Sequence, residues 1–191
     1  PIVARILESN VALLDRMYAL DPDTPRAQRE KAINLERMGN VWLVLGDTDK
    51  ALSAYQQSLE IRQRLAAADP ANTQAQRDLS VSYNKLGDVH LKLGDTQAAL
   101  TAYQQGLEIA QRLAAADPVN TEVQRGLAVS YWKLGWLEEK RQHHDEALRW
   151  YQQALPIAER LAKDTANAQA QSDLEWLQNA IKRLQGTAAE K

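Results

Sequence analysis

Cysteine is absent from the 191-residue sequence. Its absence excludes a disulfide framework, a thiolate metal site and a cysteine nucleophile, and it fits a reducing compartment such as the cytoplasm. Long apolar runs are absent as well. No stretch approaches the ~18 consecutive apolar residues of a membrane-spanning helix, and the first residues lack the charged-then-apolar order of a signal peptide. We therefore expect a cytoplasmic protein without a membrane segment.

An excess of one charge is also lacking, because 25 acidic residues nearly balance 23 basic ones and leave a net charge of -2. Nucleic acids and anionic membranes bind clustered lysine and arginine, so we expect neither as a partner. The sequence has no glycine-rich phosphate loop, nucleophile elbow or dinucleotide fingerprint. The cluster His143-His144-Asp145 lacks the further convergent ligands of a metal or acid–base site. We expect no enzyme activity, catalytic residue, cofactor or metal ion.

What the sequence does contain is a repeat of 48 residues. Gly39, Gly87 and Gly135 follow that interval, and residues 45–79 and 93–127 share 26 identities in 35 positions. A fixed interval of this size indicates an array of supersecondary units. We expect one array over residues 1–191. Its expected parts are a half repeat with helix B only (1–22), three repeats (23–70, 71–118 and 119–166), a terminal capping helix (167–186) and a tail (187–191).

Each unit is predicted to form two antiparallel helices, here called helix A and helix B. In the second unit Leu79, Tyr83 and Leu86 recur at spacings of four and three, which is the stripe of an amphipathic helix and not the alternation of a strand. The same pattern in the other units gives eight helices and almost no strand. The fold class is therefore expected to be all-α.

The turns of the second unit have recognisable end signals. Gly94 can end helix A in a left-handed conformation, and Asp95 can supply the N-cap oxygen of helix B. Helix B is interrupted at Asp117-Pro118, after which Asn120 can cap the next helix A. These signals predict where the helices begin and end.

The residues of the second unit resemble the tetratricopeptide repeat. The resemblance rests on Tyr83-x-x-Leu86-Gly87 and on Gly94, Ala99, Tyr103 and Gly106. It covers nearly the whole chain, although the usual unit has ~34 residues and the unit here is an extended variant. In the third copy Gln142 stands where the family's turn glycine would be, which leaves that turn's geometry open. The resemblance implies a right-handed α-solenoid whose A helices line a concave groove for a partner's peptide or helix.

The resemblance also indicates which side chains would face this groove. Carried over residue by residue, they are Ile33, Glu36, Arg37, Asn40 and Leu43 in the first unit, Val81, Asn84, Lys85, Asp88 and Leu91 in the second, and Val129, Trp132, Lys133, Trp136 and Glu139 in the third.

Two tryptophans distinguish the third unit from the second. Trp132 and Trp136 stand where the second unit has Asn84 and Asp88. They lie one helical turn apart and so share a face, which the resemblance places in the groove, where large aromatics are typical binding anchors. The alternative is that the pair is core and packs against the C-terminal helix through Trp176. Both interpretations stay open at this point.

A basic residue recurs at one position of each helix A, as Arg37, Lys85 and Lys133. Family members that hold a C-terminal carboxylate use lysine, asparagine and arginine on this surface. Here Glu36 and Val129 stand where two of the lysines would be, so a clamp for a chaperone tail is not expected. The remaining interpretations are solvated side chains inherited by duplication and a ladder for an acidic ligand.

Together these observations favour a non-enzymatic scaffold that binds a protein or peptide partner. One alternative is self-association into a homo-oligomer through the terminal helices, with apolar residues such as Ile2, Ile6 and Leu14 joining another copy. Another is a sensor or regulatory arm of a larger multidomain protein, which the half units and the opening at Pro1 suggest.

Overall fold

The computed structural model describes residue 9, residues 24–164 and residues 167–189, and this part of the chain contains helices and turns but no strand. Its helices are α2 (Pro25–Val44), α3 (Thr48–Ala68), α4 (Thr73–Lys92), α5 (Thr96–Ala116), α6 (Thr121–Lys140), α7 (His144–Leu161) and α8 (Ala168–Ala189). The predicted all-α solenoid is confirmed. The helix expected over residues 1–22 lies outside the described residues, as do the apolar side chains proposed there for self-association.

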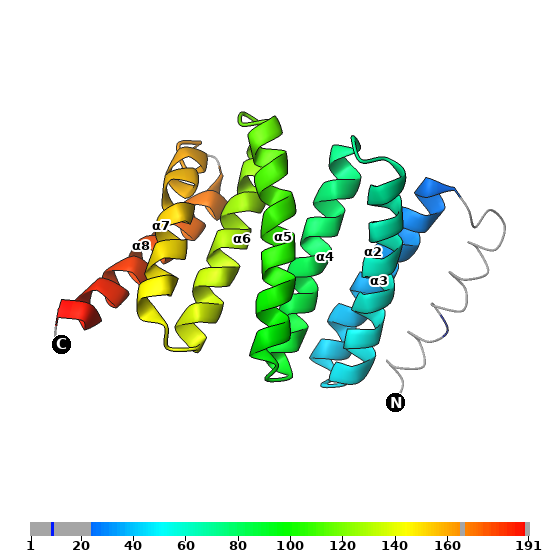
Figure 1. The fold of residues 1–191 in the computed structure, drawn as a ribbon, viewed down its shortest axis with the longest axis horizontal. Helices are drawn as coiled ribbons and strands as arrows, with labels where there is room; N and C mark the ends of the chain where they lie inside the picture. Colours follow the sequence, from blue (N-terminus) through cyan, green and yellow to red (C-terminus); the bar gives the residue numbers. More distant parts are fainter. Residues whose placement is uncertain (1–8, 10–23, 165–166, 190–191) are drawn as a thin grey trace.

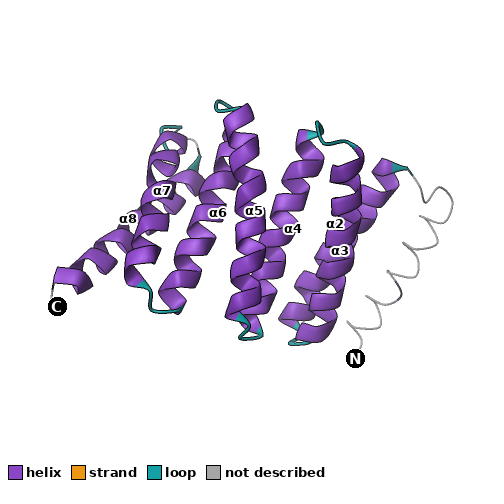
Figure 2. Cartoon of the chain, viewed as in Figure 1, coloured by secondary structure: helices purple, strands orange, loops and turns teal. Residues whose placement is uncertain are grey.

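The helices form antiparallel pairs that stand side by side along one axis, with α2 and α3 near one end and α8 at the other (Figure 1). Helices α2, α4, α6 and α8 are the A helices, and α3, α5 and α7 are the B helices. The turns lie along the two long edges of the array (Figure 2). Each helix therefore packs mainly against its neighbours in sequence, as expected of a repeat array.

The predicted end signals act as the sequence indicates. Gly94 has a φ of +81°, in the left-handed region that glycine adopts without a steric cost. Asp95 then caps α5 by accepting a hydrogen bond from the backbone nitrogen of Ala98. At the other edge, Asn120 caps α6 by accepting from the backbone nitrogens of Glu122 and Val123. These local interactions fix the helix boundaries.

The turn of the third unit keeps this geometry without a glycine. Gln142 has a φ of +63°, and its backbone nitrogen donates to the carbonyl oxygen of Glu139. The nitrogen of His143 donates to the carbonyl of Glu138, as Asp95 donates to His90 in the second unit. Gln142 is thus held in a conformation that costs most side chains about 1–2 kcal/mol.

Replacing Gln142 by glycine should therefore raise the free energy of unfolding by about 1 kcal/mol, because glycine removes that cost. Urea unfolding followed by circular dichroism measures the change. The matched control is Gln153→Gly, at an exposed position inside α7. It should lower the free energy of unfolding by about 1 kcal/mol, since glycine is a poor helix former. A loss of stability in both variants would contradict a strained turn.

A buried tyrosine joins the two helices of each pair. Tyr55, Tyr103 and Tyr151 are at most 2% exposed, and each ring lies against a glycine of the paired A helix. A Cβ atom at Gly87 or at Gly135 would lie less than 3.0 Å from the neighbouring ring. Only a residue without a side chain allows this close approach, which explains the 48-residue glycine interval.

The third unit departs from the other two in length. Helix α7 has 18 residues, whereas α3 and α5 have 21, and Pro156 lies inside it. The last helix, α8, extends to Ala189 instead of ending at residue 186 as expected.

Candidate binding groove

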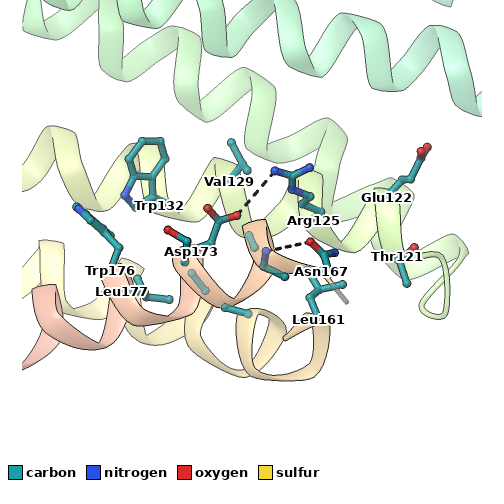
Figure 3. A pocket seen from close by; sticks show the side chains of 15 residues that line it. Thr121, Glu122, Arg125, Val129, Trp132, Leu161, Asn167, Asp173, Trp176 and Leu177 are labelled. Atoms are coloured by element: carbon teal, nitrogen blue, oxygen red, sulfur yellow. Dashed lines mark hydrogen bonds and ion pairs between the residues drawn. The ribbon is translucent and has the colours of Figure 1, made fainter. Parts of the chain in front are cut away.

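A groove of about 450 Å³ lies between α6 and α8, with α7 as its floor. Figure 3 shows Val129 and Trp132 of α6 on one side and Asp173, Trp176 and Leu177 of α8 on the other. The floor consists of small or aliphatic side chains of α7. They are Ala154, Ala158 and Leu161. The groove is therefore mostly apolar, with polar groups near its rim.

Side chains at two repeat positions distinguish the first unit from the third. One position is arginine in the first unit and alanine in the second and third, at Arg62, Ala110 and Ala158. Arg62 is 4% exposed and its guanidinium lies 2.8 Å from a carboxylate oxygen of Glu36, so this ion pair fills the space in the first unit. In the third unit the two positions hold Ala158 and Trp132, which leave space above the floor.

The A helices before the groove are joined directly. The amide nitrogen of Asn84 donates to the hydroxyl of Ser130 at 3.3 Å, and the ammonium of Lys133 lies 2.7 and 2.9 Å from the two carboxylate oxygens of Asp88. These bonds connect α4 to α6. Asn84 is buried, so it holds two helices together and is not available at the surface.

Two ion pairs join α6 to α8. Arg125 and Asp173, which both line the groove, approach to 3.8 Å, and both side chains are about half exposed. Beyond the groove, the guanidinium of Arg183 lies 2.6 Å from Glu139. Exposed pairs of this kind contribute little to stability, so the Arg125–Asp173 pair can open for a ligand.

Trp132 both packs against α8 and lines the groove. Its ring meets the ring of Trp176 edge to face, with centroids 5.5 Å apart. The indole nitrogen of Trp132 is buried and has no hydrogen-bond partner among the described residues. Trp132 thus packs against the C-terminal helix, as the core interpretation expects, and also forms part of the wall of a groove.

Trp136 lies elsewhere. It is half-buried, does not line the groove, and has the ammonium of Lys140 5.6 Å from its ring centroid. The presence of tryptophan at this position changes the hydrogen-bond acceptor of Tyr151, the buried tyrosine of the third unit. The hydroxyl of Tyr103 donates to Asp88 at 2.6 Å, but Trp136 occupies the matching place, so the hydroxyl of Tyr151 donates instead to Glu139 at 3.0 Å.

The tyrosine hydroxyls are held as neutral donors. Burial, followed by the nearby carboxylates Glu36 and Asp88, raises the pKa of Tyr55 to about 12. Burial, followed by one nearby carboxylate, also raises the pKa of Tyr103 and of Tyr151 above the ordinary value for tyrosine; the carboxylate is Asp88 for Tyr103 and Glu139 for Tyr151. The hydroxyl of Tyr55 donates to the amide oxygen of Asn40 at 2.8 Å. Asn40, Asp88 and Glu139 thus accept bonds from within the chain.

Three further groove candidates are apolar residues with different surroundings. Leu43 and Leu91 are half-buried and pack against core clusters that include Trp42 and Tyr103. Val81 is 44% exposed. Of the predicted set, Val129 and Trp132 line the groove between α6 and α8, whereas Ile33 is half-buried on α2.

Charged groove candidates fall into two groups. The acidic ones are paired: Glu36 with Arg62, Asp88 with Lys133, and Glu139 with Arg183. Arg37, which is exposed, and Lys85, which is half-buried, have no hydrogen-bond or ion-pair partner within the part of the chain that the structure describes.

Residues of α7 and α8 complete the groove, and sequence reasoning did not place them there. Ala154, Ala158 and Ala170 line the groove but are not among the residues predicted from the sequence, and Trp176 is predicted only as a packing partner. The series Arg62, Ala110 and Ala158 separates the first unit from the other two, but it does not separate the second unit from the third.

Neither a metal-binding cluster nor a membrane-spanning helix is found among the described residues. Residues 24–164 and 167–189 contain no group of three or more metal-binding side chains, and none of their helices is long and apolar enough to cross a membrane. His143 instead contacts the carboxylate of Glu138 at 2.7 Å, and Arg141 contacts the same carboxylate at 2.9 Å.

The sequence of the chain matches the model of one protein family. The family model described as tetratricopeptide repeat matches residues 30–112 and 78–160, which together span more than half of the chain. The chain belongs to the tetratricopeptide repeat family. The fold of this family suggests a protein–protein interaction scaffold, and the resemblance drawn from the sequence is confirmed. No curated protein matches the chain in sequence.

Solved structures of other proteins resemble the chain to different degrees. The crystal structure of BtubC (BKLC) from P. vanneervenii has a TM-score of 0.63 at 20% identity, and the match covers 97% of this chain and 73% of that one. The first tetratricopeptide domain of Spaghetti (RPAP3), bound to an HSP90 peptide, gives a TM-score of 0.43 at 20% identity, with 80% of this chain and 94% of that one covered. The likeness to BtubC, at 20% identity, shows the fold alone.

Proposed function

We propose that this tetratricopeptide protein is a non-enzymatic scaffold that binds a segment of a partner protein in the groove between α6 and α8. The observation that carries the proposal is the apolar hollow beside Trp132 and Trp176, above the small side chains of Ala154 and Ala158. Ligand sites are typically concave and apolar with a few polar groups at the rim. Trp176 is 39% exposed, so an aromatic surface is available to a partner.

The proposal concerns this groove and not the whole A-helix face. Between α4 and α6 the direct bonds of Asn84 and Lys133 join the helices. In the first unit the buried Arg62–Glu36 pair fills the corresponding position. Space for a bulky side chain of a partner is therefore concentrated in the third unit. The absence of cysteine fits a cytoplasmic scaffold, which is part of the same proposal.

Self-association through α8 has less support. The face of α8 that would receive a further helix B is polar and exposed. Its residues are Gln171, Glu175, Gln178, Asn179 and Lys182. Lys182 occupies the repeat position of Gly87 and Gly135, where a side chain prevents the close approach of a buried tyrosine. The regulatory-arm alternative is compatible with the groove, since such an arm also binds a partner.

Selection from displayed random peptides tests the groove directly. The peptides should be about ten residues long, enough extended chain to span three helix spacings of ~10 Å. Val129→Glu places a charge in the apolar groove and should weaken binding of the enriched peptides at least about tenfold, since truncated interface anchors typically cost ~2 kcal/mol. Fluorescence anisotropy of labelled peptides measures the change.

The matched control is Val44→Glu, because Val44 is 87% exposed and lies at the end of α2, away from the groove. It should leave the affinity unchanged. Thermal melts of both variants establish that they are folded. Enriched peptides that bind Val129→Glu as well as the original protein would rule out this groove as the binding site.

A further inference from the structure

The groove between α6 and α8 is elongated along the two helices. Its α6 wall contains Arg125, Val129 and Trp132, which are four and three residues apart and so lie on one helix face. At ~1.5 Å per residue, the distance along the helix from Arg125 to Trp132 is about 10 Å. On the opposite wall, Asp173 and Trp176 follow in the same order along α8 (Figure 3). The volume of about 450 Å³ is typical of a small-molecule site.

The two ends of the groove differ in polarity. Figure 3 shows Trp132, Trp176 and Leu177 together at one end, with Arg125 and Asp173 further along. At the apolar end the rings of Trp132 and Trp176 meet edge to face, with centroids 5.5 Å apart, so they limit the length of the groove there. This arrangement fits a ligand that has one apolar end and one polar end.

The apolar part of the groove offers few hydrogen bonds to a ligand. Its floor contains Ala154 and Ala158, and its α6 wall contains Ala128 and Val129. A peptide backbone placed there would lose its hydrogen bonds to water without replacement, which is unfavourable. Methionine has the longest unbranched apolar side chain, and its four atoms in line reach only about 5 Å. A hydrocarbon chain has no polar group to satisfy and can fill the whole length.

At the polar end, the guanidinium of Arg125 can receive an anionic group. It lies 3.8 Å from Asp173, which is longer than an ordinary hydrogen bond, and it is about half exposed. Asp173 has a second partner, because the amide nitrogen of Gln169 donates to it at 2.6 Å. Glu122, another carboxylate that lines this end, is paired with Arg77 of α4. Arg125 can therefore turn to the carboxylate of a ligand while both acidic side chains keep a partner.

We propose that the groove between α6 and α8 binds a free medium-chain carboxylate, with its acyl chain over Ala154 and Ala158 and its carboxylate on Arg125. An extended hydrocarbon chain advances about 1.25 Å per carbon, given C–C bonds of ~1.52 Å at a nearly tetrahedral angle. The length of about 10 Å thus accommodates about eight carbons beyond the carboxylate.

This inference goes beyond the proposed function, because the ligand is a small amphiphile and not a segment of a protein. Both ligands would use the same groove, so the bound carboxylate would displace the partner segment. A small molecule would in this way regulate the scaffold.

Chain length gives the first test, by isothermal titration calorimetry with hexanoate, octanoate, decanoate and dodecanoate. Each buried methylene strengthens binding about fourfold, so octanoate should bind about fifteenfold more tightly than hexanoate. The gain should stop between decanoate and dodecanoate, because the groove ends at Trp132 and Trp176. An affinity that rises by the same factor up to dodecanoate, or no binding of any of the four, would overturn the proposal.

Arg125→Gln tests the polar end of the ligand. Octanoate should bind this variant about tenfold more weakly, since a charge-assisted hydrogen bond is lost. Octanol, which has the same chain without the charge, should bind both proteins alike. The matched control is Arg29→Gln, at the same repeat position on α2 and away from the groove, and it should bind octanoate like the original protein. Octylammonium that binds as tightly as octanoate would contradict a carboxylate on Arg125.

Val129→Glu and the displayed peptides separate the small ligand from the protein partner. Octanoate should displace the enriched peptides from the original protein and should not bind Val129→Glu, whereas Val44→Glu should bind it normally. If the peptides depend on Val129 but octanoate neither binds nor displaces them, the acyl inference is wrong and the proposed function stands. If octanoate behaves as expected and no peptide is enriched, the acyl site stands and the peptide proposal is wrong.

Discussion

Replacing Gly87 by alanine is expected to lower the free energy of unfolding by about 2–3 kcal/mol, towards the upper end of the usual cost of overpacking. The new Cβ atom would lie less than 3.0 Å from the ring of Tyr103, which is 0% exposed and has no room to move. Helices α4 and α5 would have to separate along their whole contact. Urea unfolding monitored by circular dichroism gives the change directly.

The same substitution at Gly126 is the control. Gly126 lies inside α6, and a Cβ atom there would meet no atom within 4 Å. Gly126→Ala should therefore raise the free energy of unfolding by about 0.5–1 kcal/mol, because alanine favours the helix. Opposite signs at the two glycines support the close approach at Gly87. A stable Gly87→Ala variant would show that α4 and α5 pack differently.

Arg62→Ala is the second large effect, and it should lower the free energy of unfolding by about 3 kcal/mol, as for other buried ion pairs that lose one partner. The guanidinium contacts Glu36 at 2.8 Å, the hydroxyl of Ser82 at 2.7 Å and the carbonyl oxygen of Asp78 at 3.1 Å. Without it, the Glu36 carboxylate remains poorly solvated next to an empty space.

A double-mutant cycle separates the ion pair from packing. Glu36→Asn combined with Arg62→Ala places in the first unit the residue types that the second unit has at Asn84 and Ala110. The double variant should be more stable than the sum of the two single changes implies, by at least about 1 kcal/mol, since contacting residues are not additive. Strictly additive losses would mean that Arg62 acts through packing and not through Glu36.

Helix boundaries and the repeat could be read from the sequence because they depend on local interactions. Asp95 and Asn120 cap the helices that directly follow them, within three residues along the chain. The turn at Gln142 stayed open because its left-handed backbone is imposed by the helices on either side. Local preference alone did not determine that conformation.

The groove and its charge could not be read in this way. Trp132 and Trp176 meet only because α6 and α8 lie on either side of α7, and Ala158 forms the floor from that third helix. Ionic partners are equally distant, since Arg62 and Glu36 are on different helices and Arg183 and Glu139 lie 44 residues apart. Which side chains are paired, and which are free for a ligand, depends on the folded array.

The exchange of hydrogen-bond acceptors for Tyr151 constrains the history of the duplicated units. The second unit has Asp88 and Leu91 where the third has Trp136 and Glu139. An ancestral third unit with tryptophan at 136 but still leucine at 139 would leave the tyrosine hydroxyl buried without an acceptor, which costs about 1–3 kcal/mol. If the copies began alike, an order in which glutamate at 139 arose before or together with tryptophan at 136 avoids this cost. Glu139 is then the substitution that permits the aromatic character of this helix.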